Sequence, residues 1–268
     1  MVAKGNIYKF FGINQYLYDI LISNQLYFAS IKQFNDPYDC HLTFPAQITL
    51  KDFKVYVNSF IKAEDIRSKY IKAFKKNPEK FFSPFKGLFK EFLDYHGICS
   101  FSKIKENLLL WSHYADSHKG VCLAFDYNLI TEQFKQFDDV EYNDDPFLFD
   151  IKDANNSISK TVLRKSKDWE YEKEIRFVME RSKSAAFNMN ALREINFGSR
   201  CSKRNMLNII YLIKKLGYRK CKFLKAEINN TNYSVLFEEI DFENLKKEVL
   251  EDSKEKRFKQ NFDLSHLL

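Results

Sequence analysis

The apolar positions of this chain recur with two different periods, and the period changes several times along the sequence. Short apolar or alternating runs indicate β-strands, whereas apolar residues three and four positions apart indicate helices. Strands are predicted for residues 6–11, 26–29, 97–102, 120–126, 140–142, 169–177, 192–197, 223–228 and 234–240. Helices are predicted for residues 15–23, 107–116, 158–168, 203–216 and 242–259. This mixture of strands and helices predicts the α+β class.

Residues 51–95 are also helical in pattern, are strongly basic, and interrupt the series of strands. Within them, Lys75-Lys76-Asn77-Pro78 separates two helices, because proline starts a helix readily but does not continue one. We therefore expect a helical insertion, about residues 48–95, in a single α+β domain over residues 1–268. Residues 242–268 are expected to form a C-terminal helix and tail.

The composition is that of a globular protein, and it excludes one class of binding site. Hydrophobic residues make up 45% of the 268 residues and charged residues 29%, which is ordinary for a soluble domain with a sizeable core. The chain has 7 glycines, and neither GxGxxG nor GxxxxGK[ST] is present. A glycine-rich loop that cradles phosphates is therefore not expected.

The net charge permits a polyanionic partner without identifying one. Lys and Arg total 43 against 36 Asp and Glu, which gives a formal net charge of +7. Such an excess allows nucleic acid as a partner. The mixture of both signs nevertheless favours a solvated surface over a binding stripe.

The cysteines and the N-terminus favour a cytoplasmic protein. The five cysteines are scattered and contain no CxxC pair; two of them, Cys99 and Cys122, lie in apolar runs and are expected to pack as small hydrophobic side chains. The first residues lack an apolar signal core, and no run approaches the ~20 apolar residues that span a bilayer. We expect a reducing, cytoplasmic location and no membrane partner.

The stretch WEYEKEIRF, residues 169–177, concentrates charge in a predicted strand. Because side chains alternate along a strand, Glu172, Glu174 and Arg176 share one face. Two carboxylates and a guanidinium in a row are costly unless they face water, pair with one another or bind a ligand. This stripe is therefore either a solvated sheet face or the centre of an active site.

Two carboxylates on one strand face have a local geometry that suits glycosidic chemistry. Glu174 can stabilise an oxocarbenium-like cation, and Glu172 can orient or deprotonate a nucleophile. Repulsion between the two raises one pKa unless Arg176 compensates. Glu-x-Glu by itself is a frequent pattern, so the assignment depends on other stretches of the chain.

Two shorter stretches also place polar groups beside aromatic residues. In FNDPYD, residues 34–39, the side chains of Asn35, Asp36 and Asp39 either line a site or form a capped turn. In SFS, Ser100 and Ser102 lie on one strand face and can bind a ribose or a phosphate, although Ser-x-Ser is also common on surfaces.

The stretch LLWSHYADSHKG contains Trp111, His113, Tyr114 and His118. On a helix, Trp111 and Tyr114 fall on the side that faces the core. His113 and His118 are five positions apart, about 140° around a helix, so metal binding would require the helix to end between them, and we expect no metal. His118 is then either a cation near a helix C-terminus or a group that binds a base or a pyrophosphate.

Together these motifs resemble a bacterial family that is known only as a domain of unknown function. Its members share YK(Y/F), FNDP(F/Y)D, C(F/L)S, an LLWSHYA..H.G segment and W.YE.E(I/W)R, in this order. The corresponding residues here are Tyr8-Lys9-Phe10, Phe34–Asp39, Cys99–Ser102, Leu109–Phe125 and Trp169–Arg176. The resemblance spans about residues 7–200 and implies no activity.

The order of the motifs is also similar to that of the ADP-ribosyltransferase fold, whose members bind NAD in a cleft between two small, mostly antiparallel sheets. In that fold an early strand supplies Arg or His, a middle strand often reads Ser-x-Ser, and a late strand carries Glu-x-Glu. The resemblance implies that Glu174 is the catalytic glutamate, which contacts the nicotinamide ribose, and that Glu172 positions the acceptor. Tyr8 and Lys9 stand in place of the usual Arg or His.

The resemblance further implies NAD as a substrate and a protein or a nucleic acid as the acceptor. The implied binding residues are Tyr8, Lys9, Asn35, Asp36, Asp39, Ser100, Ser102, Trp111, His113, Tyr114, His118 and Arg176. Toxins and phage-defence effectors are frequent among such divergent transferases, so a role of this kind is expected by analogy.

Two other hypotheses remain. A metal-dependent nuclease or phosphodiesterase would hold Mg²⁺ or Mn²⁺ with Asp36, Asp39, His113, His118 and Glu174. A non-catalytic module would bind a nucleotide or a nucleic acid through the basic helices of residues 51–90.

Overall fold

The computed structural model describes residues 5–229 and 231–262. These residues fall into two compact units. The first unit combines the described parts of Met1–Leu26, Phe101–Gln133 and Ala186–Leu268. The second unit combines Tyr27–Ser100 with Phe134–Ala185.

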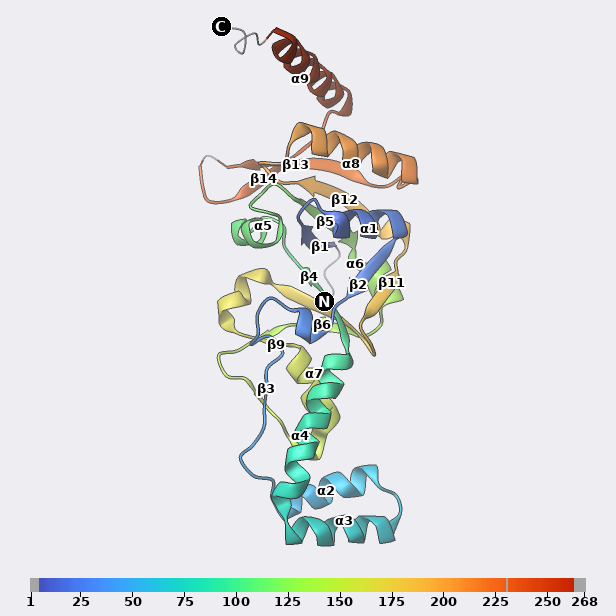
Figure 1. Ribbon diagram of the computed structural model, residues 1–268, viewed down its shortest axis with the longest axis vertical. Helices are drawn as coiled ribbons and strands as arrows, with labels where there is room; N and C mark the ends of the chain where they lie inside the picture. The colour runs from blue at the N-terminus through green and yellow to red at the C-terminus, as the bar shows by residue number, and fades with distance from the viewer. Residues whose placement is uncertain (1–4, 230, 263–268) are drawn as a thin grey trace. The chain divides into compact units, whose positions relative to one another are not determined.

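The first unit is built on a mixed sheet of β1 (Asn6–Phe11), β5 (Val121–Asp126), β12 (Leu192–Phe197), β13 (Lys222–Ile228) and β14 (Val235–Glu239). Its strand order is β14-β13-β12-β5-β1 (Figure 1). Neighbouring strands are antiparallel except β12 and β13, which are parallel and are connected by α8 (Lys203–Leu216). In β5 five consecutive residues are buried, as expected for an inner strand with both faces covered.

The sequence of α8 explains its ends and its packing. The side chain of Ser202 accepts a hydrogen bond from the backbone N–H of Asn205, which caps the helix. Gly217 ends it in the left-handed conformation, with φ of 85°. The buried face consists of Met206, Leu207, Ile209, Ile210 and Ile213. The other helices of this unit are α1 (Gln15–Ser23), α5 (Leu108–Tyr114), α6 (Tyr127–Gln133), α9 (Phe242–Phe262) and the 3₁₀-helix η4 (Met189–Ala191).

In the second unit, β10 (Glu174–Met179) lies between β4 (Gly97–Ser102) and β6 (Phe137–Asp139). β10 and β6 are antiparallel. Ser102, at the end of β4, belongs to the first unit and pairs there with Tyr8. The short strands are β3 (Leu42–Thr43) with β8 (Phe147–Leu148), β7 (Glu141–Tyr142) with β9 (Arg164–Lys165), and β2 (Gln25–Phe28) with β11 (Lys183–Ala186).

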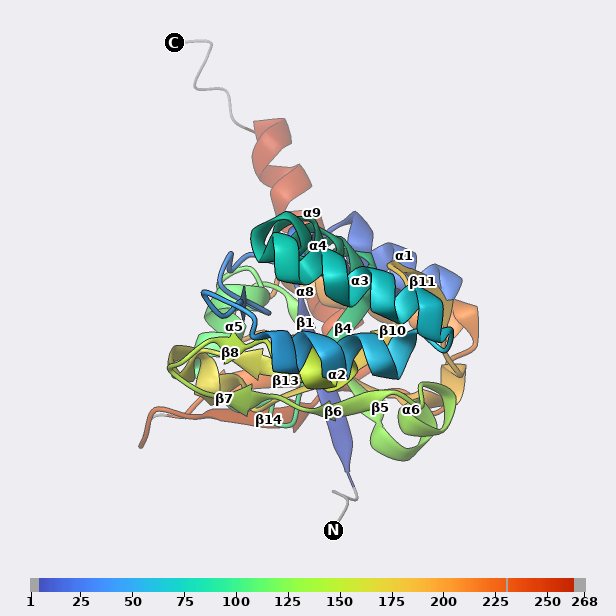
Figure 2. The same cartoon turned by 90° about the horizontal axis from the view of Figure 1, so that it is seen from below.

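Helices α2 (Leu50–Phe60), α3 (Glu64–Lys76) and α4 (Pro78–Tyr95) lie in the segment predicted as a helical insertion. Figure 2 shows α2 and α3 side by side, and the rings of Phe53 and Phe74 stack between them with centroids 4.0 Å apart. The remaining helices are α7 (Ala154–Val162), η1 (Ile31–Gln33), η2 (Ile151–Asp153) and η3 (Lys167–Glu172). No helix within residues 5–229 and 231–262 has the length and the apolar character needed to cross a membrane.

The predicted α+β class is confirmed. The segment 51–95, predicted as two helices, forms three, because α2 ends at Phe60 and α3 begins at Glu64. Two further predicted elements are wrong in part. The predicted helix 158–168 ends early, because α7 stops at Val162 and the next residues form β9. The predicted strand 169–177 starts late, because residues 167–172 form η3. In both cases the side chains of Lys165 and Glu172 enter a buried group of charges, and this tertiary pairing overrides the local pattern. Residues 263–268 of the predicted tail lie outside the described residues.

Candidate functional site

A cluster of charged side chains is buried in the second unit. We call it the ion cluster; its members are Asp39, Lys165, Glu172, Glu174 and Arg176, each at most 7% exposed. Burying a charge is costly unless the charge is paired and hydrogen-bonded. The contacts of Arg176 and Lys165 therefore determine which carboxylates of the cluster are paired.

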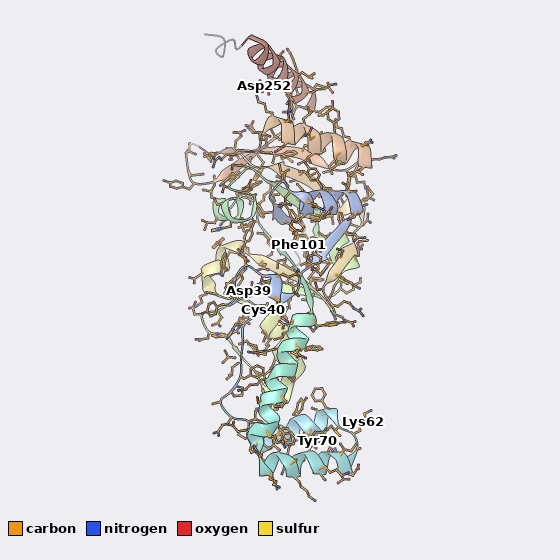
Figure 3. All side chains as sticks on the ribbon, viewed as in Figure 1. Asp39, Cys40, Lys62, Tyr70, Phe101 and Asp252 are labelled. Atoms are coloured by element: carbon orange, nitrogen blue, oxygen red, sulfur yellow. The ribbon has the colours of Figure 1, made fainter. Side chains whose placement is uncertain are left out.

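Arg176 is the central cation of the ion cluster and is completely buried. Nη2 donates to both carboxylate oxygens of Asp39, at 2.8 and 2.7 Å, and Nε donates to Oε1 of Glu174 at 2.8 Å. Nη1 donates to the carbonyl oxygen of Val162 at 2.7 Å and to Sγ of Cys40 at 3.0 Å. Asp39 and Cys40 are labelled side by side in Figure 3. The guanidinium thus ties the chain before β3 and the end of α7 to β10.

Lys165, in β9, connects the carboxylates to one another. Its Nζ donates to Oε2 of Glu172 at 2.6 Å and to Oε2 of Glu174 at 3.1 Å. The same nitrogen lies 3.5 Å from Oδ2 of Asp39. Both glutamates of the Glu-x-Glu motif are therefore held on one ammonium group.

The two cations keep the Glu174 carboxylate ionised. Burial by itself would raise its pKa, but the charges of Arg176 and Lys165, with hydrogen bonds from Arg176 and Ser100, lower the pKa from 4.5 to about 2. Burial would also lower the pKa values of Lys165 and Arg176, but the neighbouring carboxylates raise both. Glu174 and both cations are therefore charged at neutral pH.

Acid is expected to destabilise the protein through Glu174. Its folded pKa of about 2 lies below the 4.5 of the free side chain, so the stabilisation is complete above pH 4.5 and is lost as the pH falls towards 2. A shift of this size corresponds to about 3 kcal/mol of unfolding free energy. Urea unfolding at a series of pH values from about 6 to about 3 measures the decline. The decline should be smaller in Glu174→Gln, and an equal decline in that variant would contradict the assignment.

The ion cluster also joins two sequence motifs. The side chain of Ser100, in β4, hydrogen-bonds to the Glu174 carboxylate, and β4 and β10 are neighbouring strands. The backbone N–H of Glu174 donates to the Tyr142 hydroxyl at 2.7 Å. The Ser-x-Ser and Glu-x-Glu motifs therefore meet at one carboxylate.

A turn at Lys173 brings Glu172 and Glu174 onto the same cation. Lys173 has φ of 47°, in the left-handed region, and separates η3 from β10. Its own side chain is half-exposed and reaches Oε1 of Glu170 at 3.3 Å. The stripe of Glu172, Glu174 and Arg176 is thus not a solvated sheet face, because all three side chains are buried.

A polar pocket of about 540 Å³ borders the ion cluster, and Lys165 and Trp169 are among its lining residues. Nζ of Lys165 lies 5.0 Å from the centre of the Trp169 ring. The predicted residues Asn35 and Asp36 also line the pocket. Oδ1 of Asp36 accepts a hydrogen bond from the backbone N–H of Tyr38 at 2.8 Å, so the predicted capped turn is present as well.

The other predicted binding residues belong to the first unit, and several of them lie at Trp111. Trp111 is completely buried, as its position in the helical pattern predicts. Its ring packs edge-on against Phe10, with centroids 5.2 Å apart, and nearly parallel to the His118 imidazole at 6.3 Å. Tyr114 lies beside the exposed His113, with ring centres 6.2 Å apart. Trp111 is therefore a core residue rather than an open stacking surface.

His118 lies on a strained loop after α5. Residues 116–118 have φ of 46°, 52° and 68°, a left-handed conformation that residues other than glycine rarely adopt. Nε2 of His118 lies 3.2 Å from Oγ of Ser112, and burial together with the charge of Arg200 lowers the pKa of His118. α5 ends at Tyr114, between His113 and His118, so the expectation that a continuous helix prevents a metal-binding pair does not apply here.

Tyr8 and Lys9 lie on β1, and Ser102 lies at the end of β4. Burial and nearby carboxylates raise the pKa of Tyr8 to about 12, so its hydroxyl is protonated at neutral pH. Nζ of Lys9 lies 5.4 Å from the centre of the Phe101 ring. Oγ of the buried Ser102 accepts a hydrogen bond from the backbone N–H of Ile104 at 3.1 Å.

Part of the chain is similar to a known protein family. Residues 110–177 match the family model described as "Protein of unknown function (DUF2971)". The matched residues include Trp111, Lys165, Glu172, Glu174 and Arg176. The prediction of a family of unknown function is confirmed for this minor part of the chain, and the description names no activity. No curated protein and no solved structure matches the chain.

The metal-dependent hypothesis uses Asp36, Asp39 and Glu174 of the second unit and His113 and His118 of the first. In the part of the chain that the structure describes, no group of three or more His, Cys, Asp or Glu side chains is placed to hold a metal ion. Asp39 and Glu174 are bound to Arg176. This geometry gives the nuclease hypothesis no support.

The sequence pattern does not reveal Lys165, Cys40 or Tyr142 as parts of the site. Lys165 lies in a basic run that is typical of a solvated helix face, and Cys40 is one of several scattered cysteines. Cys40 contacts Arg176, which is 136 positions away in the sequence, and such contacts leave no local spacing signal.

Proposed function

We propose that this chain is an ADP-ribosyltransferase-like enzyme, which binds NAD, breaks its nicotinamide–ribose bond and transfers ADP-ribose to an acceptor. The observation that carries the proposal is the side-chain hydrogen bond between Ser100 and Glu174. It joins a Ser-x-Ser motif and a Glu-x-Glu motif on neighbouring strands, in agreement with the motif order of that fold.

Glu174 supplies negative charge where the ribose becomes cationic. As nicotinamide leaves with the bonding electrons, the ribose approaches an oxocarbenium ion, which a carboxylate stabilises. This role needs a carboxylate that is ionised and held in place before the reaction. The pKa of about 2 and the contacts with Arg176 and Lys165 agree with both needs. Glu172, which shares Lys165, positions the acceptor.

The pocket beside the ion cluster favours a basic protein side chain as the acceptor. Its charged lining residues are Asp36, Asp144, Asp145, Asp168, Arg164 and Lys165. This excess of carboxylates attracts cations and repels phosphates. A protein acceptor is therefore favoured over a nucleic acid, and the diphosphate of NAD is expected to bind outside this pocket.

Release of nicotinamide from NAD tests the proposal directly. The purified wild-type protein should release nicotinamide, and Glu174→Gln should lower the rate by about 100-fold, because a neutral amide no longer stabilises the developing charge. Chromatography of the reaction mixture measures the product. Wild-type protein that releases no nicotinamide with any basic protein or peptide acceptor would refute the proposal.

Glu170→Gln is the matched control. Glu170 lies in the same segment, but its side chain is 56% exposed and contacts only the exposed Lys173 among the ion pairs of the described residues. Its activity should equal that of the wild type. Because Glu174→Gln removes a buried charge, thermal unfolding of each variant is used to show that the protein is folded under assay conditions. Glu172→Gln provides a second test, since Glu172 is proposed to position the acceptor. Full activity of folded Glu174→Gln and folded Glu172→Gln would also refute the proposal.

A non-catalytic nucleotide-binding module is the second candidate. The observation in its favour is that the Glu174 carboxylate is 4% exposed and already accepts hydrogen bonds from Arg176 and Lys165. A carboxylate that is bound in this way has less contact with a substrate. NAD that binds in calorimetry without release of nicotinamide would support this module and exclude the enzyme.

A further inference from the structure

An apolar pocket of about 350 Å³, which we call the α2–α4 pocket, is lined by residues of the helical insertion and by Ile151 of η2, and it contains no member of the ion cluster. All of its lining residues are aliphatic, aromatic or proline. The aromatic ones are Phe53, Tyr56, Phe60, Tyr70, Phe74 and Phe81. The only polar side-chain atoms that such a lining offers are the two tyrosine hydroxyls. It therefore suits an apolar side chain or chain segment rather than a polar ligand.

The mouth of this pocket exposes large apolar side chains. Phe60 is 53% exposed and Tyr70 is 45% exposed, although both line the pocket. Ile66, one turn before Tyr70 on α3, is 41% exposed. Figure 3 labels Tyr70 on the α2–α3 pair. Clustered exposed apolar side chains around a concave site are typical of a surface that binds another protein.

Helix α3 adds an unpaired positive charge to this surface. After Glu64 and Asp65 in its first turn, α3 contains no Asp or Glu but includes Arg67, Lys69, Lys72, Lys75 and Lys76. None of these cations forms an ion pair with a described residue. Arg67 precedes Tyr70 by three positions and therefore lies on the face of α3 that carries the pocket. The partner that complements this helix is acidic.

We infer that the α2–α4 pocket is a docking site for an acidic, amphipathic peptide segment of a partner protein. The segment inserts aromatic or aliphatic side chains between Phe60 and Tyr70, and its carboxylates face Arg67 and the lysines of α3. This is the groove mode of peptide recognition, in which apolar anchors provide affinity and charges provide orientation. A nucleic acid fits less well, because the pocket offers almost no donors or acceptors to base edges.

A synthetic peptide tests the docking site on the full chain. The probe is a fluorescein-labelled helix of about 15 residues, with Phe and Leu at positions i, i+3, i+4 and i+7 and Glu elsewhere. Fluorescence polarisation should show saturable binding that weakens as salt is added. The Phe60→Ala/Tyr70→Ala variant should bind the probe about tenfold more weakly. Both side chains are half-exposed, so the variant should remain folded.

Controls separate the pocket from simple charge attraction. Ile22→Ala removes a 57% exposed side chain from α1 and should leave binding unchanged. A peptide with Ala in place of Phe and Leu should bind about tenfold more weakly than the probe. Absence of saturable binding, equal binding of the two peptides, or an unaffected Phe60→Ala/Tyr70→Ala variant would each overturn the inference. Tighter binding of single-stranded RNA than of the probe, with the same dependence on Phe60 and Tyr70, would overturn it in favour of a nucleic-acid site.

Discussion

The Arg176→Met variant is expected to lose about 3–5 kcal/mol of unfolding free energy. Methionine fills part of the volume of the arginine but leaves Asp39 and Glu174 buried without the cation that they share. Lys165 then remains as the single cation for three buried carboxylates. Removing one partner from a buried ion pair is costly for this reason. Urea unfolding at neutral pH, followed by circular dichroism, measures the loss.

Arg193→Met provides the matched control for this experiment. Arg193 pairs with Asp126 at 2.8 Å, but the two side chains are 30% and 24% exposed. Water compensates for the loss of such a pair, so the cost should stay below about 1 kcal/mol. Adding Asp39→Asn to Arg176→Met should recover part of the unfolding free energy, because the double variant no longer buries the Asp39 carboxylate without its cation. If Arg176→Met lowers the unfolding free energy no more than Arg193→Met does, the prediction that the ion cluster is buried and paired is contradicted.

The Trp111→Ala variant is expected to lose about 3–5 kcal/mol. The indole is completely buried, and its removal opens a cavity against Phe10 and His118. It also leaves the carbonyl oxygen of Lys105 without the Nε1–H donor that lies 2.7 Å away. Thermal and urea unfolding measure the effect.

Two substitutions on the same helix show whether this effect comes from packing. Trp111→Phe keeps an aromatic ring but loses the Nε1–H donor and should cost about 1–3 kcal/mol. His113→Ala removes an exposed side chain and should change the unfolding free energy by less than about 0.5 kcal/mol. A Trp111→Ala protein as stable as His113→Ala would show that the tryptophan is not a core residue.

Elements with complete local signals could be predicted from the sequence. The strand over residues 6–11 and the helix over residues 15–23 occur as predicted, because their periodicity and the Asn14 cap are local features. The helix over residues 203–216 also occurs as predicted, with Ser202 at one end and Gly217 at the other. In these segments, local preference and tertiary packing agree.

Prediction fails where distant charges meet. Residues 158–177 have a helical and then a stranded pattern, yet the chain turns at Val162 and again at Lys173. The turns allow Lys165 and Glu172 to reach a common point beside Glu174. Local propensities contribute a fraction of a kcal/mol per residue, whereas an unpaired buried charge costs several. The ion cluster therefore outweighs the pattern.

The sequence by itself determined the α+β class, most helix and strand positions and the presence of charge at Glu172, Glu174 and Arg176, because each of these depends on neighbouring residues. Only the tertiary structure decided what that charge does. It brings Asp39 and Lys165 to the stripe, buries all five side chains and binds Ser100 to Glu174. Burial and pairing depend on residues far apart in the chain, and the low polarity of the interior makes those pairings strong enough to choose the local fold.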